Sequence, residues 1–364
     1  MIRYAVVGTG WIADAFIEGA ALAGGLRLSA VYSRREETGR AFAQKYGELP
    51  VWTDLPALAA SEEIDAVYIA SPNALHYSQS RLFLEHGKHV LCEKPITVTS
   101  RQLRELSSLA EKRGLVYLEA IMMRHLPARA VLKEAAAQLG TVRSARFDFS
   151  QLSSKYAALQ AGGLPNIFNP AMATGGLMDL GIYCVYPALD LFGKPERLDA
   201  SAVFLPSGAD GAGCCQLWYP DKVVSLTYSK TAQSRIGSEI LGDGGTLAIH
   251  SISQLTGLRL YHPDGTDELL LGERSKAELM SGEAAAFRRF IACRSVRNDS
   301  AAYADYQDYQ DAAALSLAVC ETLEEIRRKA GIRFADDPPD FPGKSVDKSK
   351  KREAALCTEN RFPL

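Results

Sequence analysis

Short apolar runs alternate with amphipathic stretches over the first third of the chain. The runs are rich in valine, isoleucine and tyrosine, and the stretches between them carry apolar side chains at helical spacing. The runs cover residues 3–8, 26–33, 66–71, 89–93 and 115–120. Alternating β and α units of this length predict a parallel, doubly wound sheet, and we place this first domain at residues 1–121.

The pattern changes after Ala120. A helix is predicted at residues 130–140 and a strand at residues 142–150. A polar segment containing glycine and proline comes next, and then a helical run at residues 177–193. The sequence therefore predicts a second unit of mixed α and β character.

Strand-like runs separated by turns follow between about Asp199 and Gly272. The last two flank Pro263-Asp264-Gly265, which is a hairpin signal. Helices return at residues 283–293 and 311–331, and the periodic pattern stops near Asp337. We expect an α/β domain with a large sheet over residues 122–337, and a disordered tail over residues 338–364.

Size and composition fit a globular protein of two domains. The chain has 364 residues, of which 47% are hydrophobic and 23% are charged. The net charge of −2 gives no general attraction to nucleic acid or to anionic lipid, and no apolar run is long enough to span a membrane. We therefore expect a small-molecule substrate, with neither nucleic acid nor a membrane as partner.

Cysteine and histidine usage favours a cytoplasmic protein without a metal site. The seven cysteines are scattered and form no C-x-x-C pair, which is typical of reduced thiols. The six histidines show no metal-ligand spacing. The chain opens on a predicted strand and not on a signal peptide.

A glycine loop follows the first predicted strand. Residues 6–16 fit G-x-G-x-x-A with Gly8, Gly10 and Ala13, and an amphipathic helix and a second strand come after it. Gly8 would allow a tight turn, and Gly10 would let the backbone approach a pyrophosphate at the helix N-terminus. The loop therefore predicts a dinucleotide site formed by Gly8, Thr9, Gly10, Trp11 and Ile12, against the alternative of a plain turn.

The tip of the second strand indicates which dinucleotide is preferred. An acidic residue there usually binds the ribose 2′-hydroxyl of NAD, but this chain has Ser33 and Arg34. Arginine offers a planar fork to a 2′-phosphate, which favours NADP. NAD remains possible if Arg34 is only a solvated residue and Glu36 or Glu37 binds the ribose.

Four motifs in order resemble one family of enzymes. They are G-x-G-x-x-A at Gly8, "SPNALH" at residues 71–76, "EKP" at residues 93–95 and "GGLMDLGIYCVY" at residues 175–186. Together they resemble the glucose-fructose oxidoreductase / inositol dehydrogenase (Gfo/Idh/MocA) family over about residues 1–337. With "IFNP" and "IRFADD", they are most similar to its dimeric trans-dihydrodiol dehydrogenase and NADP-dependent D-xylose dehydrogenase branch.

The resemblance implies an N-terminal Rossmann domain and a C-terminal α/β domain with a large, mostly antiparallel sheet. It also implies a cis bond before Pro95 and further cofactor contacts, which are Ser71, Pro72, Asn73, His76, Glu93 and Lys94. Two of these have other interpretations. Asn73 could simply cap the following helix, and His76 could be a surface residue of that helix.

The resemblance implies an NAD(P)-dependent dehydrogenase or reductase that transfers a hydride between nicotinamide and a sugar, polyol or cyclic dihydrodiol. Many members place histidine where this chain has Tyr183, in the pattern D-x-x-x-H, so tyrosine points away from inositol chemistry. Two alternatives stay open. One is a non-catalytic dinucleotide-binding regulator or sensor, and the other is a reductase of a non-sugar carbonyl compound.

Lys94, Tyr183 and Asp179 are the expected catalytic residues. Alcohol oxidation leaves a proton that a base must accept, and free tyrosine, with a pKa near 10, is a poor base at neutral pH. A nearby ammonium group would lower that pKa, and Lys94 ends a predicted strand where it could supply the charge. Asp179 and Tyr183, four residues apart, would share one helix face. The alternative for both is ordinary helix packing.

The predicted strands of the second domain suggest a homodimer. Residues 214–220 and 222–230 carry sizeable side chains on both faces. Burying only one face against helices would leave an apolar patch in water. We therefore expect two copies of the chain to meet through this sheet, the alternative being a monomer whose sheet is covered by helices.

Overall fold

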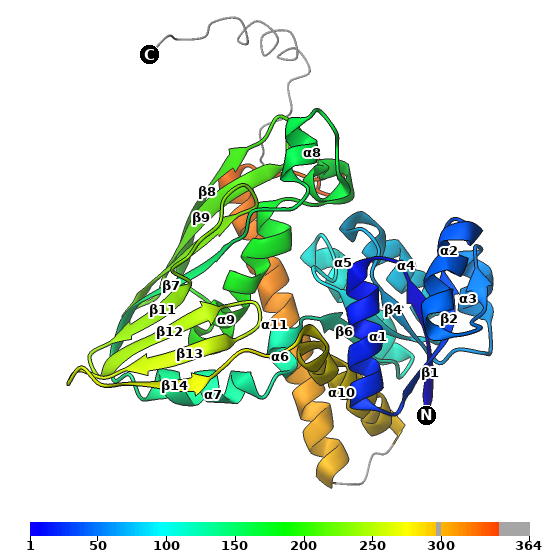
Figure 1. The fold of residues 1–364 in the computed structure, drawn as a ribbon, viewed down its shortest axis with the longest axis horizontal. Helices are drawn as coiled ribbons and strands as arrows, with labels where there is room; N and C mark the ends of the chain where they lie inside the picture. Colours follow the sequence, from blue (N-terminus) through cyan, green and yellow to red (C-terminus); the bar gives the residue numbers. More distant parts are fainter. Residues whose placement is uncertain (296–299, 342–364) are drawn as a thin grey trace, which may run out of the picture.

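The computed structural model describes residues 1–295 and 300–341, so most of the predicted tail lies outside the described residues. Its first sheet is parallel, as the sequence predicts, and its strand order is β3-β2-β1-β4-β5-β6 (Figure 1). The strands are β1 (Ile2–Val7), β2 (Leu26–Tyr32), β3 (Val51–Trp52), β4 (Ala66–Ile69), β5 (His89–Glu93) and β6 (Tyr117–Ala120). The two-residue β3 was not predicted, because it is too short to show any periodicity.

Helices cover both faces of this first sheet. All four residues of β4 are buried, as expected for a strand that is enclosed on both sides. The helices are α1 (Trp11–Ala23), α2 (Glu36–Ala43), α3 (Leu55–Ala60), α4 (Asn73–Glu85) and α5 (Ser100–Lys112), with a 3₁₀ turn at Gln44–Tyr46. A doubly wound sheet of this kind places its ligand site at the carboxyl ends of its strands.

The second sheet is large and mostly antiparallel, with the order β14-β13-β12-β11-β7-β10-β9-β8. Only β7 and β10 pair in parallel among its described strands. The strands are β7 (Val142–Ser150), β8 (Arg197–Phe204), β9 (Asp210–Trp218), β10 (Val223–Ser229), β11 (Ser238–Gly242), β12 (Gly245–Ser251), β13 (Thr256–Tyr261) and β14 (Asp267–Leu271). The hairpin predicted between β13 and β14 is confirmed, and His262 N–H donates to the Thr266 carbonyl at 2.8 Å.

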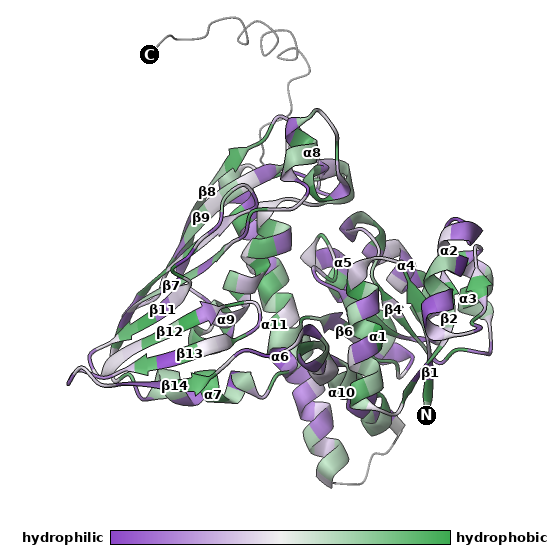
Figure 2. Ribbon diagram, viewed as in Figure 1, coloured by the Kyte–Doolittle hydropathy of each residue, from purple (hydrophilic) through white to green (hydrophobic). Residues whose placement is uncertain are grey.

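One face of the second sheet is covered by helices. Along β10 and β12, buried and partly exposed residues alternate over most of each strand, and Figure 2 shows hydrophobic residues in the strands of this sheet. The covering helices include α7 (Ala128–Ala137), α9 (Ile182–Phe192) and the long α11 (Ser300–Ala330), which runs between the two sheets. This part also contains two short helices, α6 (Met122–His125) and α8 (Tyr156–Gln160). It has 3₁₀ turns at Asn166–Phe168 and Pro170–Met172 and a π-helix at Leu177–Gly181.

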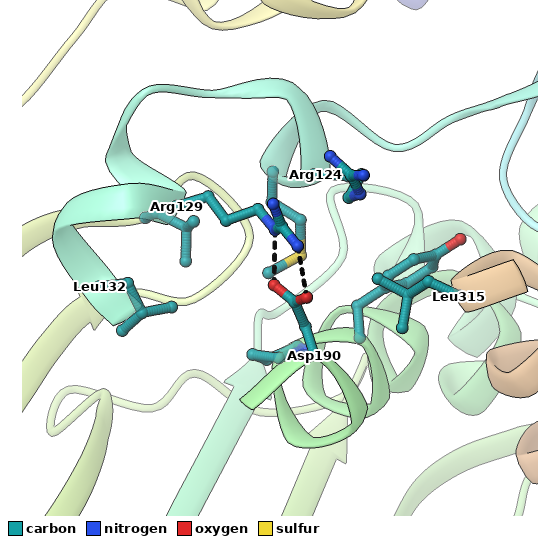
Figure 3. A pocket seen from close by; sticks show the side chains of 9 residues that line it. Arg124, Arg129, Leu132, Asp190 and Leu315 are labelled. Atoms are coloured by element: carbon teal, nitrogen blue, oxygen red, sulfur yellow. Dashed lines mark hydrogen bonds and ion pairs between the residues drawn. The ribbon is translucent and has the colours of Figure 1, made fainter. Parts of the chain in front are cut away.

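A paired guanidinium and carboxylate join α7 to α9. Arg129 donates from Nε and Nη2 to the two oxygens of Asp190, at 2.6 and 2.7 Å (Figure 3). Lys133 also contacts Asp190, at 2.9 Å. The adjoining cavity measures about 10 Å³, which is no more than one water molecule needs. We therefore interpret this cluster as a connection between helices and not as a ligand site.

Helix α10 (Lys276–Ser295) packs against α1 of the first sheet, although it falls within the predicted second domain. Gly19 of α1 permits this contact, because a Cβ atom there would lie 2.9 Å from the main chain of Met280. Met280, Phe287 and Phe290 join the apolar core beneath the parallel sheet. The domain boundary at residue 121 stays a prediction.

Candidate active site

A cleft of about 460 Å³ lies at the carboxyl ends of β1, β4 and β5. One wall comes from the first sheet and α10, and the other from residues 166–183. The lining residues are Gly10, Trp11, Ile12, Ala70, Ser71, Pro72, Asn73, Glu93, Lys94, Ala120, Met122, Asn166, Ile167, Thr174, Asp179, Tyr183, Lys276, Met280 and Glu283. Most of the predicted site residues therefore meet in one place, and Gly8, Thr9, Ser33, Arg34 and His76 do not line it directly.

The glycine loop has the geometry that a dinucleotide requires. Gly8 has φ +113°, and a Cβ atom there would lie 2.6 Å from the Ala70 carbonyl oxygen. Gly10 precedes α1, no side chain caps that helix end, and a Cβ atom at Gly10 would meet nothing within 4 Å. The first N–H groups of α1 can therefore bind an anion that enters the cleft.

The tip of β2 presents a cation that makes no contact with a carboxylate. Arg34 is exposed, and its guanidinium has neither a hydrogen bond nor an ion pair within residues 1–295 and 300–341. Glu36, one of the two alternative ribose ligands beside Glu37, accepts a hydrogen bond from Arg40 Nε at 2.9 Å. The Glu36 carboxylate is thus already paired, which weakens the case for Glu36, though not for Glu37, as a ligand of the NAD ribose.

Asn73 and His76 occupy positions that the sequence did not settle. Pro72 is the residue that precedes α4, so Asn73 is not its cap; its Nδ2 donates to the Ala173 carbonyl at 2.9 Å, across the cleft. His76 is fully buried, so its interpretation as a surface residue is wrong. Its two ring nitrogens lie 2.8 Å from the carbonyl oxygens of Pro95 and Ser71. It therefore joins the segment after β4 to the segment after β5.

Lys94 contacts both of its predicted partners. Its peptide bond to Pro95 is cis, as the resemblance implied. Its Nζ donates to the Asp179 carbonyl at 2.7 Å and to Asp179 Oδ1 at 3.1 Å. The same nitrogen lies 4.8 Å from the centroid of the Tyr183 ring. A strand end of the first sheet and a helix of the second part thus meet in one cluster.

A second lysine, Lys230, completes this cluster, and the sequence analysis missed it. Its Nζ is paired with Asp179 Oδ2 and donates to the Ile167 carbonyl at 3.2 Å. Burial alone would raise the pKa of Asp179, but the charges of Lys94 and Lys230 outweigh burial and lower it. Lys230 directly follows the apolar strand β10, as Lys94 follows β5, and that pattern was the available signal.

Tyr183 differs from the prediction in its protonation. Lys94 does lower its pKa, but burial acts more strongly in the opposite direction, and the net result is a raised pKa. The phenol is therefore protonated at neutral pH. Its ring packs edge to face against Phe149 at 5.5 Å, and its hydroxyl makes no hydrogen bond within the described part of the chain. The hydroxyl is thus free to donate a proton to a ligand.

Helix geometry places Asp179 and Tyr183 on the cleft. The predicted single helix begins as the π-helix Leu177–Gly181, which carries Asp179, and continues as α9. Such π segments are frequent at functional sites. Gly176 and Gly181 lie against the Tyr228 ring of β10, where a Cβ atom at either would come within 2.9 Å. The glycines let the helix rest directly on the sheet.

Two further charged residues of the cleft, Lys276 and Glu283, were also missed. Both lie on α10, whose predicted extent began only at residue 283. Glu283 is flanked on the buried face of α10 by Met280 and Phe287, at spacings of three and four residues. A carboxylate within an apolar helical stripe was the signal that could have identified it.

Fold and cleft together define a dinucleotide-binding enzyme whose cleft holds a charged cluster. Residues 2–120 match the Gfo/Idh/MocA oxidoreductase family with its NAD-binding Rossmann fold, and residues 128–248 match the family's C-terminal domain. The chain belongs to the Gfo/Idh/MocA family and is an NAD(P)-dependent oxidoreductase.

Two relatives cover nearly the whole chain. It is 38% identical over 337 residues to scyllo-inositol 2-dehydrogenase (NADP(+)) IolU of Bacillus subtilis, a match that covers 93% of this chain and 99% of the relative. It is 28% identical to mouse trans-1,2-dihydrobenzene-1,2-diol dehydrogenase, over 92% of this chain and 99% of the relative.

Among solved structures, the 3-ketoreductase KijD10 of Actinomadura kijaniata, in complex with NADP and TDP-benzene, superposes with a TM-score of 0.76. The two are 22% identical, and the match covers 90% of this chain and 98% of that one, which supports the fold. None of the helices within residues 1–295 and 300–341 is long and apolar enough to cross a membrane.

Proposed function

We propose that the protein is an NADP-preferring oxidoreductase that interconverts a hydroxyl group and a carbonyl group on a polyol, sugar or cyclic dihydrodiol. The observation that best supports this proposal is that Lys94 contacts both Asp179 and Tyr183 in the cleft beside the glycine loop. A bound dinucleotide would supply or accept the hydride, and the protein must handle the proton.

Tyr183 is the proton donor in this proposal. Its protonated hydroxyl would donate to the carbonyl oxygen of a substrate during reduction, and its phenolate would accept the proton in the reverse direction. Burial would lower the pKa of Lys94, but neighbouring negative charge, including the Asp179 carboxylate, outweighs burial and raises it, so Lys94 stays charged. It would stabilise the phenolate, while Asp179, held between two lysines, orients Lys94.

NADP preference rests on the tip of β2. The exposed, unpaired Arg34 suits a 2′-phosphate, and Glu36 is already paired with Arg40. The relative from Bacillus subtilis is named as NADP-dependent, which supports the same assignment. We therefore expect NADP to bind more tightly than NAD.

The substrate class is polyhydroxylated and includes inositols. Tyr183 led the sequence analysis away from inositol chemistry, but the likeness to a scyllo-inositol dehydrogenase returns inositols to the candidates. Turnover should be screened with NADP and a panel of inositols, aldoses and dihydrodiols, following the absorbance of reduced nicotinamide. Activity on one class supports the proposal. Tight NADP binding without turnover on any class would instead favour a regulator, or a reductase of a non-sugar carbonyl compound.

We also propose a homodimer formed through the outer face of the large sheet. In Figure 1 no described helix lies on the left side of the labelled strands β7, β8, β9 and β11. Leu241 on β11 and Val203 on β8 are exposed there, 38% and 67% respectively. Apolar side chains on an open sheet face favour association with a second copy.

A reducing compartment, the cytoplasm, is the proposed location. The six cysteines within the described residues are free thiols, and five of them are buried. Unpaired thiols in a protein of this size are typical of the reducing cytoplasm. Cell fractionation of the natural source, with a known cytoplasmic marker, tests this assignment.

A further inference from the structure

Glu283 is a buried carboxyl group that has no hydrogen-bond partner within residues 1–295 and 300–341. Its side chain lines the cleft, the residue is only 1% exposed, and neither carboxyl oxygen has a partner. An unpartnered buried carboxyl group is costly, and a protein keeps one where something else needs it. Glu119, at 3% exposure, provides the contrast, because it accepts from Ile96 N–H at 2.9 Å and from the Tyr186 hydroxyl.

The surroundings of Glu283 keep it protonated. Burial raises its pKa well above the usual range, the charge of Glu93 on β5 adds to this effect, and Lys276 on its own helix opposes it. Tyr68 of β4 and Tyr183 of α9 are also within the reach of its charge. A neutral carboxylic acid offers one O–H donor and one carbonyl acceptor side by side.

The fold places this acid on the cofactor side of the cleft. Helix α10 packs against α1, whose N-terminus is the expected pyrophosphate site, and Gly19 allows the close approach at Met280. Met280, on the turn of α10 before Glu283, also lines the cleft. Asp179 and Tyr183 line the opposite wall. A ligand that bonds Glu283 therefore lies against the Rossmann sheet, between the glycine loop and Lys94.

We propose that Glu283 binds the carboxamide of the nicotinamide ring through a pair of hydrogen bonds. Its O–H would donate to the amide oxygen, and its carbonyl oxygen would accept from the amide N–H. A primary amide is the part of the dinucleotide that complements a neutral carboxylic acid on both sides. The inference rests on the proposed function, because it requires that NADP binds in this cleft.

Binding measurements with three ligands test the proposal. The ligands are NADP, its 3-acetylpyridine analogue, which lacks the amide N–H donors, and adenosine 2′,5′-bisphosphate, which lacks the nicotinamide half. Each is titrated by calorimetry against the wild type, Glu283→Leu and Glu283→Gln, with substrate absent. We expect Glu283→Leu to lower the affinity for NADP roughly 10-fold and to leave the affinity for the bisphosphate unchanged. This variant should bind NADP and the analogue with equal affinity. Glu283→Gln, which can also bond an amide on both sides, should retain most of the affinity.

Stability separates a binding role from a structural one. Because Glu283 has no partner to lose, Glu283→Leu should keep or raise the melting temperature of the ligand-free protein. Glu119→Leu, the matched control, should lower it, since its carboxylate has partners.

Three results would overturn the inference. In the first, Glu283→Leu binds NADP as tightly as the wild type does. In the second, Glu283→Leu loses equal affinity for NADP and for the bisphosphate. In the third, the wild type binds NADP and its analogue with equal affinity. A wild type that binds neither NADP nor NAD would instead show that the proposed function itself is wrong.

Discussion

The ammonium group of Lys94 lies over the ring of Tyr183, 4.8 Å from the ring centroid, while it hydrogen-bonds Asp179 at 3.1 Å. The lysine comes from the end of a parallel strand and the tyrosine from a helix on the second sheet. This cluster of Lys94, Asp179 and Tyr183 therefore exists only when both parts of the molecule are folded and packed together.

Tyr183→Phe should reduce kcat roughly 100-fold or more, because it removes only the proton-donating hydroxyl. The ring would still pack against Phe149 and beneath Lys94, so the affinity for NADP should stay nearly unchanged. Steady-state kinetics and a binding titration measure the two effects. Nearly full turnover in Tyr183→Phe would show that another group, with Lys94 first, moves the proton.

Lys230→Met should destabilise the protein and impair turnover, because it leaves Asp179 with one lysine instead of two. Because the Asp179 side chain is 35% exposed and keeps Lys94 as a partner, the loss should fall below the roughly 3 to 5 kcal/mol that a fully buried pair costs. Lys194→Met is the matched control, since Lys194 is 74% exposed and lies 4.0 Å from Glu321. Denaturant unfolding measures the loss in the free energy of unfolding for each variant. Equal losses in Lys230→Met and Lys194→Met would show that the pairing of Lys230 with Asp179 does not stabilise the protein.

Asp179→Asn should make stability less dependent on pH in the acid range. The folded-state pKa of Asp179 is lowered, so its carboxylate stabilises the fold above the unfolded pKa of about 3.9, and that contribution is lost as pH falls further. The stability difference between wild type and Asp179→Asn should be constant near neutral pH and shrink below about pH 4. Thermal melts across this range test the sign, and a gap that widened with acid would contradict it.

Arg34→Ala should lower the affinity for NADP roughly 10-fold to 150-fold and change the affinity for NAD little, because only NADP offers a 2′-phosphate to the guanidinium. Arg27→Ala is the control, since Arg27 is an exposed arginine near the start of β2, at the end opposite to Arg34. Fluorescence titration can follow both cofactors through Trp11, which lines the cleft and is 70% exposed. Equal wild-type affinities for NADP and NAD would refute the preference.

Leu241→Glu should dissociate the proposed dimer, because it places a charge on the outer face of the large sheet. Leu22→Glu is the control, since Leu22 is 63% exposed on α1, away from that sheet. Light scattering at micromolar concentration measures the mass of each. A wild type that ran as a monomer would rule out the dimer.

The sequence predicted the parallel sheet, the glycine loop and the Lys94, Asp179 and Tyr183 cluster, because each depends on local pattern or on a motif. It missed β11, a five-residue strand that ends in Gly242 and carries few β-branched side chains. It also missed Lys230 and Glu283, whose importance comes from contacts between segments distant in the sequence. The raised pKa of Tyr183 could not be predicted, since it depends on how completely the folded protein buries the ring.

The segment between β7 and the π-helix has a consequence for enzyme engineering. Asn166, Ile167 and Thr174 form part of the cleft wall, yet they belong to turns and loops and not to either sheet. Lys94, Asp179 and Tyr183 are held instead by a strand end and by a helix resting on a sheet. A library that varies the turn residues can therefore reshape the cavity for new polyols while the proton-transfer apparatus stays in place.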